Sequence, residues 1–116
     1  MNAPVLAQVT LSTEDAIIYA PRKGQQAKIT NIRISPNDTV TDYTITVTIT
    51  APGKDAKYLY VKGLSLTAGD WLNDSSEYHL SYGQSITALC SEADLVDIVI
   101  NGEVSDLVIK NQLSNP

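Results

Sequence analysis

The sequence contains little of the side-chain chemistry that enzymes, metal sites and disulfide-stabilised folds depend on. Its 116 residues include one cysteine, one histidine and no phenylalanine. A single cysteine, Cys90, excludes any disulfide within the chain. The chain is nevertheless long enough for one domain that buries roughly two-thirds of the surface of its unfolded form. Such a domain can fold without a disulfide or a metal.

Basic residues are also scarce. Lys and Arg together number 8, against 13 Asp and Glu, and the net charge is -5. The densest basic pair is Arg22-Lys23. Because binding to phosphates needs clustered Lys and Arg, we expect no nucleic acid among the partners.

Long apolar runs are missing as well. No run approaches the ~20 residues of a membrane-spanning helix, so we expect no membrane contact. Residues 1–8 lack a basic region followed by a long apolar core, so we expect no signal peptide and synthesis in a cytoplasm.

What the sequence does contain is a set of β-strand patterns, and the clearest is Tyr43–Thr50. This segment reads Tyr-Thr-Ile-Thr-Val-Thr-Ile-Thr. A period of two places Tyr43, Ile45, Val47 and Ile49 on one face of a strand and the threonines on the other. Every residue is β-branched or aromatic, the types that suit a half-buried pleated surface. We predict that this segment is a central strand of the core.

Similar short patterns fill the rest of the chain. Turn residues such as those at 35–38, 51–55 and 73–76 separate them at intervals of about 8–12 residues. This spacing predicts an all-β protein, an antiparallel β-sandwich (Ig-like or jelly-roll-like) of about eight strands. We expect residues 1–116 to form a single domain with a short N-terminal arm over about 1–8 and a loose C-terminal tail over about 111–116.

Three segments depart from simple alternation. The apolar residues of 26–35 change parity near Thr30-Asn31, which predicts a β-bulge. Asn101-Gly102 lies between two apolar runs and predicts a two-residue hairpin. Residues 57–62 are apolar at both parities, which indicates a strand covered on both faces or a strand at an interface.

Few residues are candidates for chemistry. His79 has no nucleophile motif near it, so we interpret it as an outward strand residue, and Cys90 is more consistent with a buried, inert thiol than with a nucleophile. The loop at 70–77 and the link after Cys90 carry oxygen ligands of the kind that calcium takes, but without the EF-hand order: Asp70, Asn73, Asp74 and Glu77, then Glu92, Asp94 and Asp97. We expect no catalytic residue, cofactor or metal, and therefore no enzyme.

The remaining candidates are surfaces. The row Thr44, Thr46, Thr48 and Thr50 suits a solvent face, with a subunit contact or ice binding as alternatives. Tyrosine and tryptophan offer large contact areas with a polar group and are enriched at interface hot spots. The interface candidates are therefore Tyr58, Tyr60, Trp71, Tyr78 and Tyr82.

Five segments carry a resemblance by their order along the chain. They are Ala-Lys-Ile-Thr-Asn-Ile-Arg-Ile at 27–34, the threonine-rich segment at 43–50, Leu-Ser-Leu-Thr-Ala-Gly-Asp at 64–70, Leu-Ser-Tyr-Gly-Gln-Ser-Ile at 80–86 and Val-Ile-Asn-Gly-Glu at 99–103. This order resembles that of small all-β virion proteins of tailed bacteriophages.

The resemblance implies a structural virion protein, made in the host cytoplasm. It favours a capsid decoration or cement protein that binds the outer shell, with a neck, tail or fibre component as the alternative. It implies the major capsid protein or other virion proteins as partners and a homo-oligomer, with a trimer favoured. A carbohydrate-binding β-sandwich that stacks sugars on Trp71 and the tyrosines is a further alternative.

Overall fold

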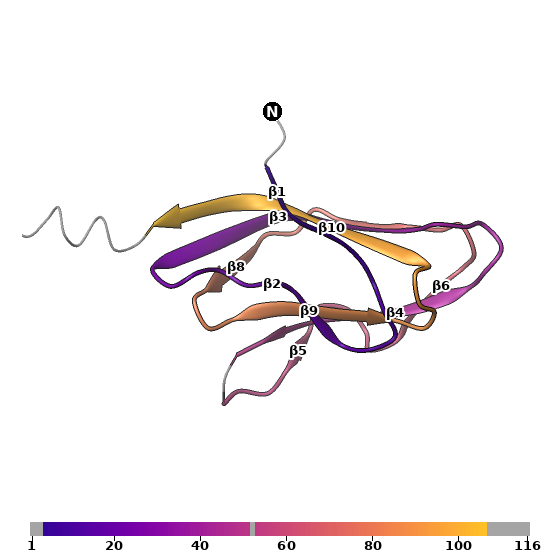
Figure 1. Ribbon diagram of the computed structural model, residues 1–116, viewed down its shortest axis with the longest axis horizontal. Helices are drawn as coiled ribbons and strands as arrows, with labels where there is room; N and C mark the ends of the chain where they lie inside the picture. Colours follow the sequence, from indigo (N-terminus) through magenta and orange to yellow (C-terminus); the bar gives the residue numbers. More distant parts are fainter. Residues whose placement is uncertain (1–3, 52, 107–116) are drawn as a thin grey trace, which may run out of the picture.

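The computed structural model describes residues 4–51 and 53–106, and these residues form ten strands and no helix. The strands make two five-stranded sheets that pack face to face (Figure 1). The first sheet has the order β1-β10-β3-β7, with β8 also paired to β3. Its strands are β1 (Val5–Thr10), β3 (Gln25–Pro36), β7 (Leu72–Asp74), β8 (Tyr78–Ser81) and β10 (Val96–Asp106).

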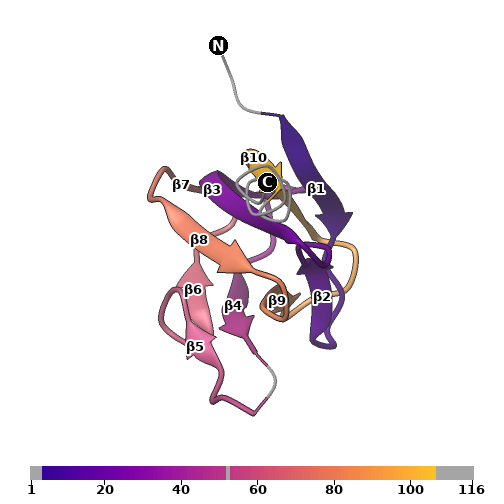
Figure 2. The ribbon, with the colours of Figure 1, turned by 90° about the vertical axis from the view of Figure 1, so that its left-hand side faces the viewer.

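The second sheet has the order β2-β9-β4-β5, with β6 also paired to β4. Its strands are β2 (Ala16–Tyr19), β4 (Tyr43–Thr50), β5 (Lys57–Tyr58), β6 (Leu64–Leu66) and β9 (Ser85–Cys90). All the pairings in both sheets are antiparallel. The end-on view in Figure 2 shows the two layers, with β1 and β2 along the same edge of the sandwich.

The connectivity is that of a jelly roll, so the structure decides between the two predicted sandwich types. Strands β7 and β8 lie end to end along β3, and β5 and β6 lie end to end along β4. Each pair fills one strand position, so the described strands occupy eight positions in two sheets of four. Two four-stranded layers linked in this order form the eight-stranded jelly roll. The prediction of about eight strands in an all-β sandwich is confirmed.

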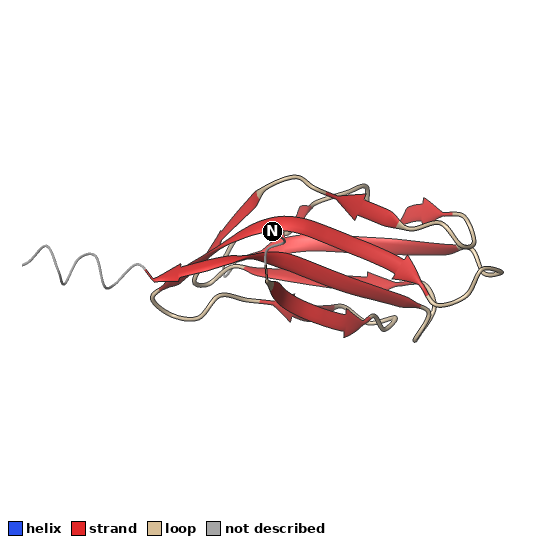
Figure 3. Ribbon diagram, turned by 90° about the horizontal axis from the view of Figure 1, so that it is seen from above, coloured by secondary structure: helices blue, strands red, loops and turns tan. Residues whose placement is uncertain are grey.

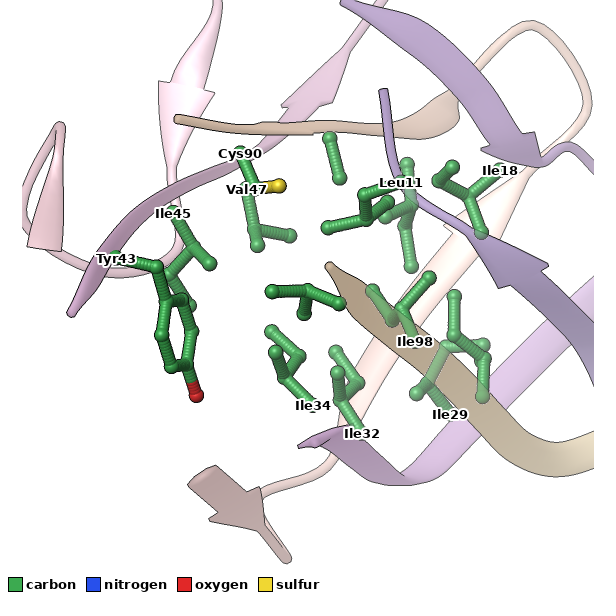
Figure 4. Close-up of a cluster of buried hydrophobic side chains, with 14 of the residues drawn as sticks. Leu11, Ile18, Ile29, Ile32, Ile34, Tyr43, Ile45, Val47, Cys90 and Ile98 are labelled. Atoms are coloured by element: carbon green, nitrogen blue, oxygen red, sulfur yellow. The ribbon is translucent and has the colours of Figure 1, made fainter. Parts of the chain in front are cut away.

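The alternating patterns create the core because each strand directs one parity into the space between the sheets. Strand β4 has the predicted bounds, and its Tyr43, Ile45 and Val47 are buried. They meet Ile32 and Ile34 of β3 and other residues of the opposite layer (Figure 4). Figure 3 shows that the long strands run along the length of the molecule, so this core extends between its two ends.

The predicted bulge is confirmed, whereas the predicted hairpin is wrong. Asn31 pairs with Asn101 and Ile29 pairs with Gly102, which leaves Thr30 as the extra residue on β3. Strand β10 continues through Asn101-Gly102 without a turn. The signal for a two-residue turn instead marks the partner side of the bulge, where a glycine allows two backbones to approach closely.

Two other expectations change in extent. Residues 5–8, which we expected in the arm, belong to β1 and pair with β10. Of the segment 57–62, only Lys57–Tyr58 is strand, and Lys57 and Tyr58 are exposed, so it is not covered on both faces. The predicted tail at 111–116 lies outside the described residues.

Candidate interaction surfaces

The five aromatic candidates divide into an exposed set and a half-buried set. Tyr82 is 62% exposed, Trp71 is 57% exposed, and Tyr58 is also exposed. Tyr60 and Tyr78 are half-buried and pack against the hydrophobic core. Hydrogen bonds to a shared partner bring Tyr60 and Tyr78 together. Trp71 lies just before β7 of the first sheet, whereas Tyr58 lies on β5 of the second.

Tyr60 and Tyr78 meet at the carboxylate of Asp74. Both hydroxyls donate to Asp74 Oδ2, with O···O distances of 2.7 Å from Tyr60 and 2.6 Å from Tyr78. The backbone N–H of Ser76 donates to Asp74 Oδ1 at 2.9 Å. These bonds connect the loop after β5 to the β7–β8 turn, which is a structural role for both tyrosines.

The pKa values around Asp74 follow from this arrangement. Burial acts to raise the pKa of Asp74, but the hydrogen bonds from Tyr78, Ser76 and Tyr60 outweigh it and lower that pKa below its usual value. Burial raises the pKa of Tyr60 and of Tyr78, and the Asp74 charge raises both further. Asp74 is therefore ionised and both tyrosines are neutral at pH 7.

In the segment that we considered as a calcium site, several polar groups form hydrogen bonds with other residues of the protein. Asp74 accepts the bonds just described, and the Asp70 carbonyl accepts the Tyr43 hydroxyl at 2.5 Å. Asn73 Oδ1 accepts from Asn31 Nδ2 at 2.9 Å. Within residues 4–51 and 53–106, no group of three or more His, Cys, Asp or Glu side chains could hold a metal ion.

His79 and Cys90 lie apart from any shared site. His79 is exposed, and its Nε2 lies 3.4 Å from Glu77 Oε1, close to the Lys28–Glu77 ion pair. Cys90 is buried, and its thiol donates to the Glu92 carbonyl oxygen at 2.7 Å. Burial raises the pKa of the Cys90 thiol, which disfavours the reactive thiolate.

No helix of the described part is long and apolar enough to cross a membrane.

The outer face of the second sheet carries the threonine row. The Thr48 and Thr87 hydroxyls bond to each other, and Thr50 Oγ1 bonds to Ser85 Oγ at 2.9 Å. Thr48 and Thr87 are buried, so this part of the row is not the solvent face that we predicted. Thr87 pairs with Ile17 on β2, and Thr48 pairs with Tyr58 on β5, so these two exposed residues flank the threonine pair.

Ile17 was not identified as a surface candidate from the sequence, yet it is 67% exposed. It lines a shallow depression of about 560 Å³ together with Pro21, Thr50 and Tyr82. We call Ile17, Tyr58 and Tyr82 the apolar surface. The sequence did contain a signal for an exposed isoleucine, the consecutive pair Ile17-Ile18 in a short strand. Two adjacent strand residues point to opposite faces, so one of the two must face outward.

Trp71 lies on the outer face of the first sheet, in a second depression of about 360 Å³. Polar side chains from β1, β3 and β10 surround it, among them Arg33, which the sequence analysis also missed. Arg33 lies between Ile32 and Ile34, which are both buried. The alternation of the strand was therefore the available signal that Arg33 faces outward.

Comparisons with known proteins concern the fold. No protein-family model matches the chain, and no curated protein matches it. A chain from the acid-stable capsid of Helicobacter pylori bacteriophage KHP30 has a TM-score of 0.52 at 13% identity, over 90% of this chain and 92% of that chain. The Drosophila NLP core, described for its pentamer formation and histone binding, has a TM-score of 0.52 at 15% identity, over 89% of this chain and 100% of its own.

Proposed function

We propose that this chain is a non-enzymatic structural protein of a tailed-bacteriophage particle, and that it binds the outer shell as a capsid decoration or cement protein. The observation that carries the proposal is the likeness to the bacteriophage capsid chain, which extends over nearly the whole length of both chains. The order of strand and turn segments, which resembles that of small virion proteins, supports it independently. Because proteins with a jelly roll serve many functions, the experiments below test this role directly.

The apolar surface is the proposed contact with the major capsid protein. Ile17 and Tyr82 are large, exposed and adjacent to one depression, as the centre of a protein interface requires. Apolar burial contributes ~25 cal/mol per Å², but the cost of association offsets much of it, so one contact of this size is weak. Many copies on one shell, each joining neighbouring subunits, stabilise the particle together.

The protein acts as a homo-oligomer in this proposal, and the trimer implied by the sequence resemblance is the favoured state. The Drosophila neighbour is described as a pentamer, which supports oligomerisation of this type of jelly roll without fixing the number. Light scattering of the purified protein separates three copies from five and from one. A monomer at every concentration tested contradicts this part of the proposal.

The test of the proposal is the copy number of this protein in particles. Particles from the source culture are purified on a density gradient and analysed by quantitative peptide mass spectrometry against the main shell subunit. A number of copies comparable to that subunit supports decoration. A few copies per particle replaces decoration with a neck, tail or fibre role, and absence from every particle rejects the virion proposal.

The docking surface is tested with two matched aspartate variants. Ile17→Asp places a charge on the apolar surface, and we expect it to abolish retention on particles stripped of this protein. Val40→Asp is the control, because Val40 is 83% exposed in the β3–β4 turn and lies outside the apolar surface. Equal retention of both variants would assign docking to another face.

A further inference from the structure

The depression around Trp71 has a composition that differs from that of the apolar surface. It is lined by one aromatic residue, one aliphatic residue and four polar residues: Trp71, Val99, Gln8, Arg33, Ser35 and Asp97. The pairings Gln8–Val99, Val99–Arg33 and Asp97–Ser35 place the residues from β1, β10 and β3 in two adjacent rows across the sheet. Since directly paired residues point to the same face, this side-chain set stands on a rigid floor.

The polar groups of the depression have bonding capacity left for a ligand. Within residues 4–51 and 53–106, the Arg33 guanidinium makes no hydrogen bond or ion pair. Asp97 Oδ1 accepts from Thr10 Oγ1 at 2.7 Å and from Asn37 Nδ2 at 3.5 Å, which positions the carboxylate. Asp97 Oδ2 has no donor in the same described part of the chain. A fixed acceptor and an available five-donor group therefore lie beside an exposed indole.

We propose that this depression binds a carbohydrate. One face of a pyranose ring presents C–H groups with partial positive charge, which complement the negative face of the Trp71 ring. Ring hydroxyls both donate and accept, so neighbouring hydroxyls can donate to Asp97 and accept from the parallel N–H groups of Arg33. Gln8 and Ser35, which also line the depression, supply further donors and acceptors.

Other ligand classes fit the depression less well. Asp is depleted at protein interfaces, and here the carboxylate of Asp97 is part of the lining. A nucleic acid would require several basic side chains for its phosphates, and Arg33 is the only basic residue of the lining. The site lies on the sheet opposite the apolar surface, so it stands independently of the virion proposal.

The chain contains a built-in reporter for this site, because Trp71 is its only tryptophan. The intact protein is applied to an array of bacterial and animal glycans. Each oligosaccharide that binds is then titrated in solution while the Trp71 fluorescence is recorded. We expect saturable binding with a change in the fluorescence. An array without any bound glycan overturns the proposal.

Three variants localise the binding. Trp71→Ala and Arg33→Ala are expected to weaken the affinity for the bound glycan by at least about tenfold, measured by calorimetry. Tyr82→Ala is the matched control, since Tyr82 is a similarly exposed aromatic residue that lines the other depression, and this variant should bind like the unchanged protein. Unfolding curves check that each variant is folded. Arg33→Ala provides the test if Trp71→Ala does not fold.

Two results would contradict the assignment. If Trp71→Ala and Arg33→Ala both retain full glycan affinity, the sugar binds elsewhere and this site is rejected. If no glycan binds and Trp71→Ala loses retention on stripped particles, the depression is a protein contact. The copy-number measurement is unaffected by either result, so failure of this inference and failure of the virion proposal are distinguishable.

Discussion

Gly102 lies so close to the carbonyl oxygen of Lys28 on the neighbouring strand that a Cβ atom at this position would overlap it. Such a Cβ would also stand 3.1 Å from the Cα of Ile29 and 3.0 Å from the Leu6 side chain. This close approach is where Thr30 bulges out of β3, and the N–H of Gly102 donates to the Pro4 carbonyl at 3.0 Å. The glycine thus lets three strands meet.

We expect Gly102→Ala to destabilise the protein by about 1–3 kcal/mol, because the backbone of β3 or β10 must shift to admit the methyl group. Urea unfolding followed by circular dichroism measures the change. Ser105→Ala is the control on the same strand, since Ser105 is exposed and should change the free energy of unfolding by less than about 0.5 kcal/mol. If Gly102→Ala and the unchanged protein have the same free energy of unfolding, the strands can shift to admit the methyl group without a loss of stability.

The bond between the Thr48 and Thr87 hydroxyls leads to a second prediction, a non-additive effect of substitutions on the free energy of unfolding. Both are buried and their hydroxyls bond to each other, so Thr48→Val leaves Thr87 without its partner. We expect each single valine variant to lose about 1–2 kcal/mol. The double variant removes both polar groups at nearly constant volume and should recover most of that loss. A double-mutant cycle from urea unfolding measures the coupling, and additive losses would contradict a direct bond.

Asp74 predicts a dependence of stability on pH. Its folded-state pKa is below the ordinary value of 3.8, so the ionised carboxylate stabilises the fold above that pH. This contribution is lost as the pH falls through the folded-state pKa. We expect Asp74→Asn to cost about 1 kcal/mol at pH 7, because the hydrogen bonds from Tyr60 and Tyr78 lose their charged acceptor in a partly exposed site.

The matched control for Asp74→Asn is Asp70→Asn, an exposed carboxylate just before β7, the strand that ends at Asp74. Unfolding curves at pH 7, 5 and 3 should show that the unchanged protein and Asp70→Asn lose more stability between pH 5 and pH 3 than Asp74→Asn does. If all three proteins lose the same stability between pH 5 and pH 3, Asp74 is not responsible for this pH dependence.

Local patterns in the sequence determined much of the fold. The alternation in Tyr43–Thr50 predicted β4 with its observed bounds, because burial on one side of a strand requires a period of two. The parity change near Thr30 predicted the bulge, because an extra residue reverses the facing of everything after it. The hairpin at Asn101-Gly102 failed because glycine suits both a tight turn and a close backbone approach, and local sequence does not separate the two.

The candidate surfaces were predictable only in part. Residue type identified five aromatic interface candidates, of which the structure exposes Trp71 and Tyr82. Tyr60 and Tyr78 belong to a bonded cluster that forms only when Asp74 is brought between them. Arg33 became a candidate only when pairing placed it beside Val99, far away in the sequence.

The sequence by itself determined that this protein is an all-β sandwich, where its principal strands lie and which face of a strand such as β4 enters its core. Only the tertiary structure decided that the sandwich is a jelly roll, with Val5 paired to Asn101 and Trp71 beside Arg33. The physical reason is that strand alternation is a local property of consecutive residues. Strand neighbours, in contrast, are chosen by how both sheets together bury their apolar faces and satisfy their backbone hydrogen bonds.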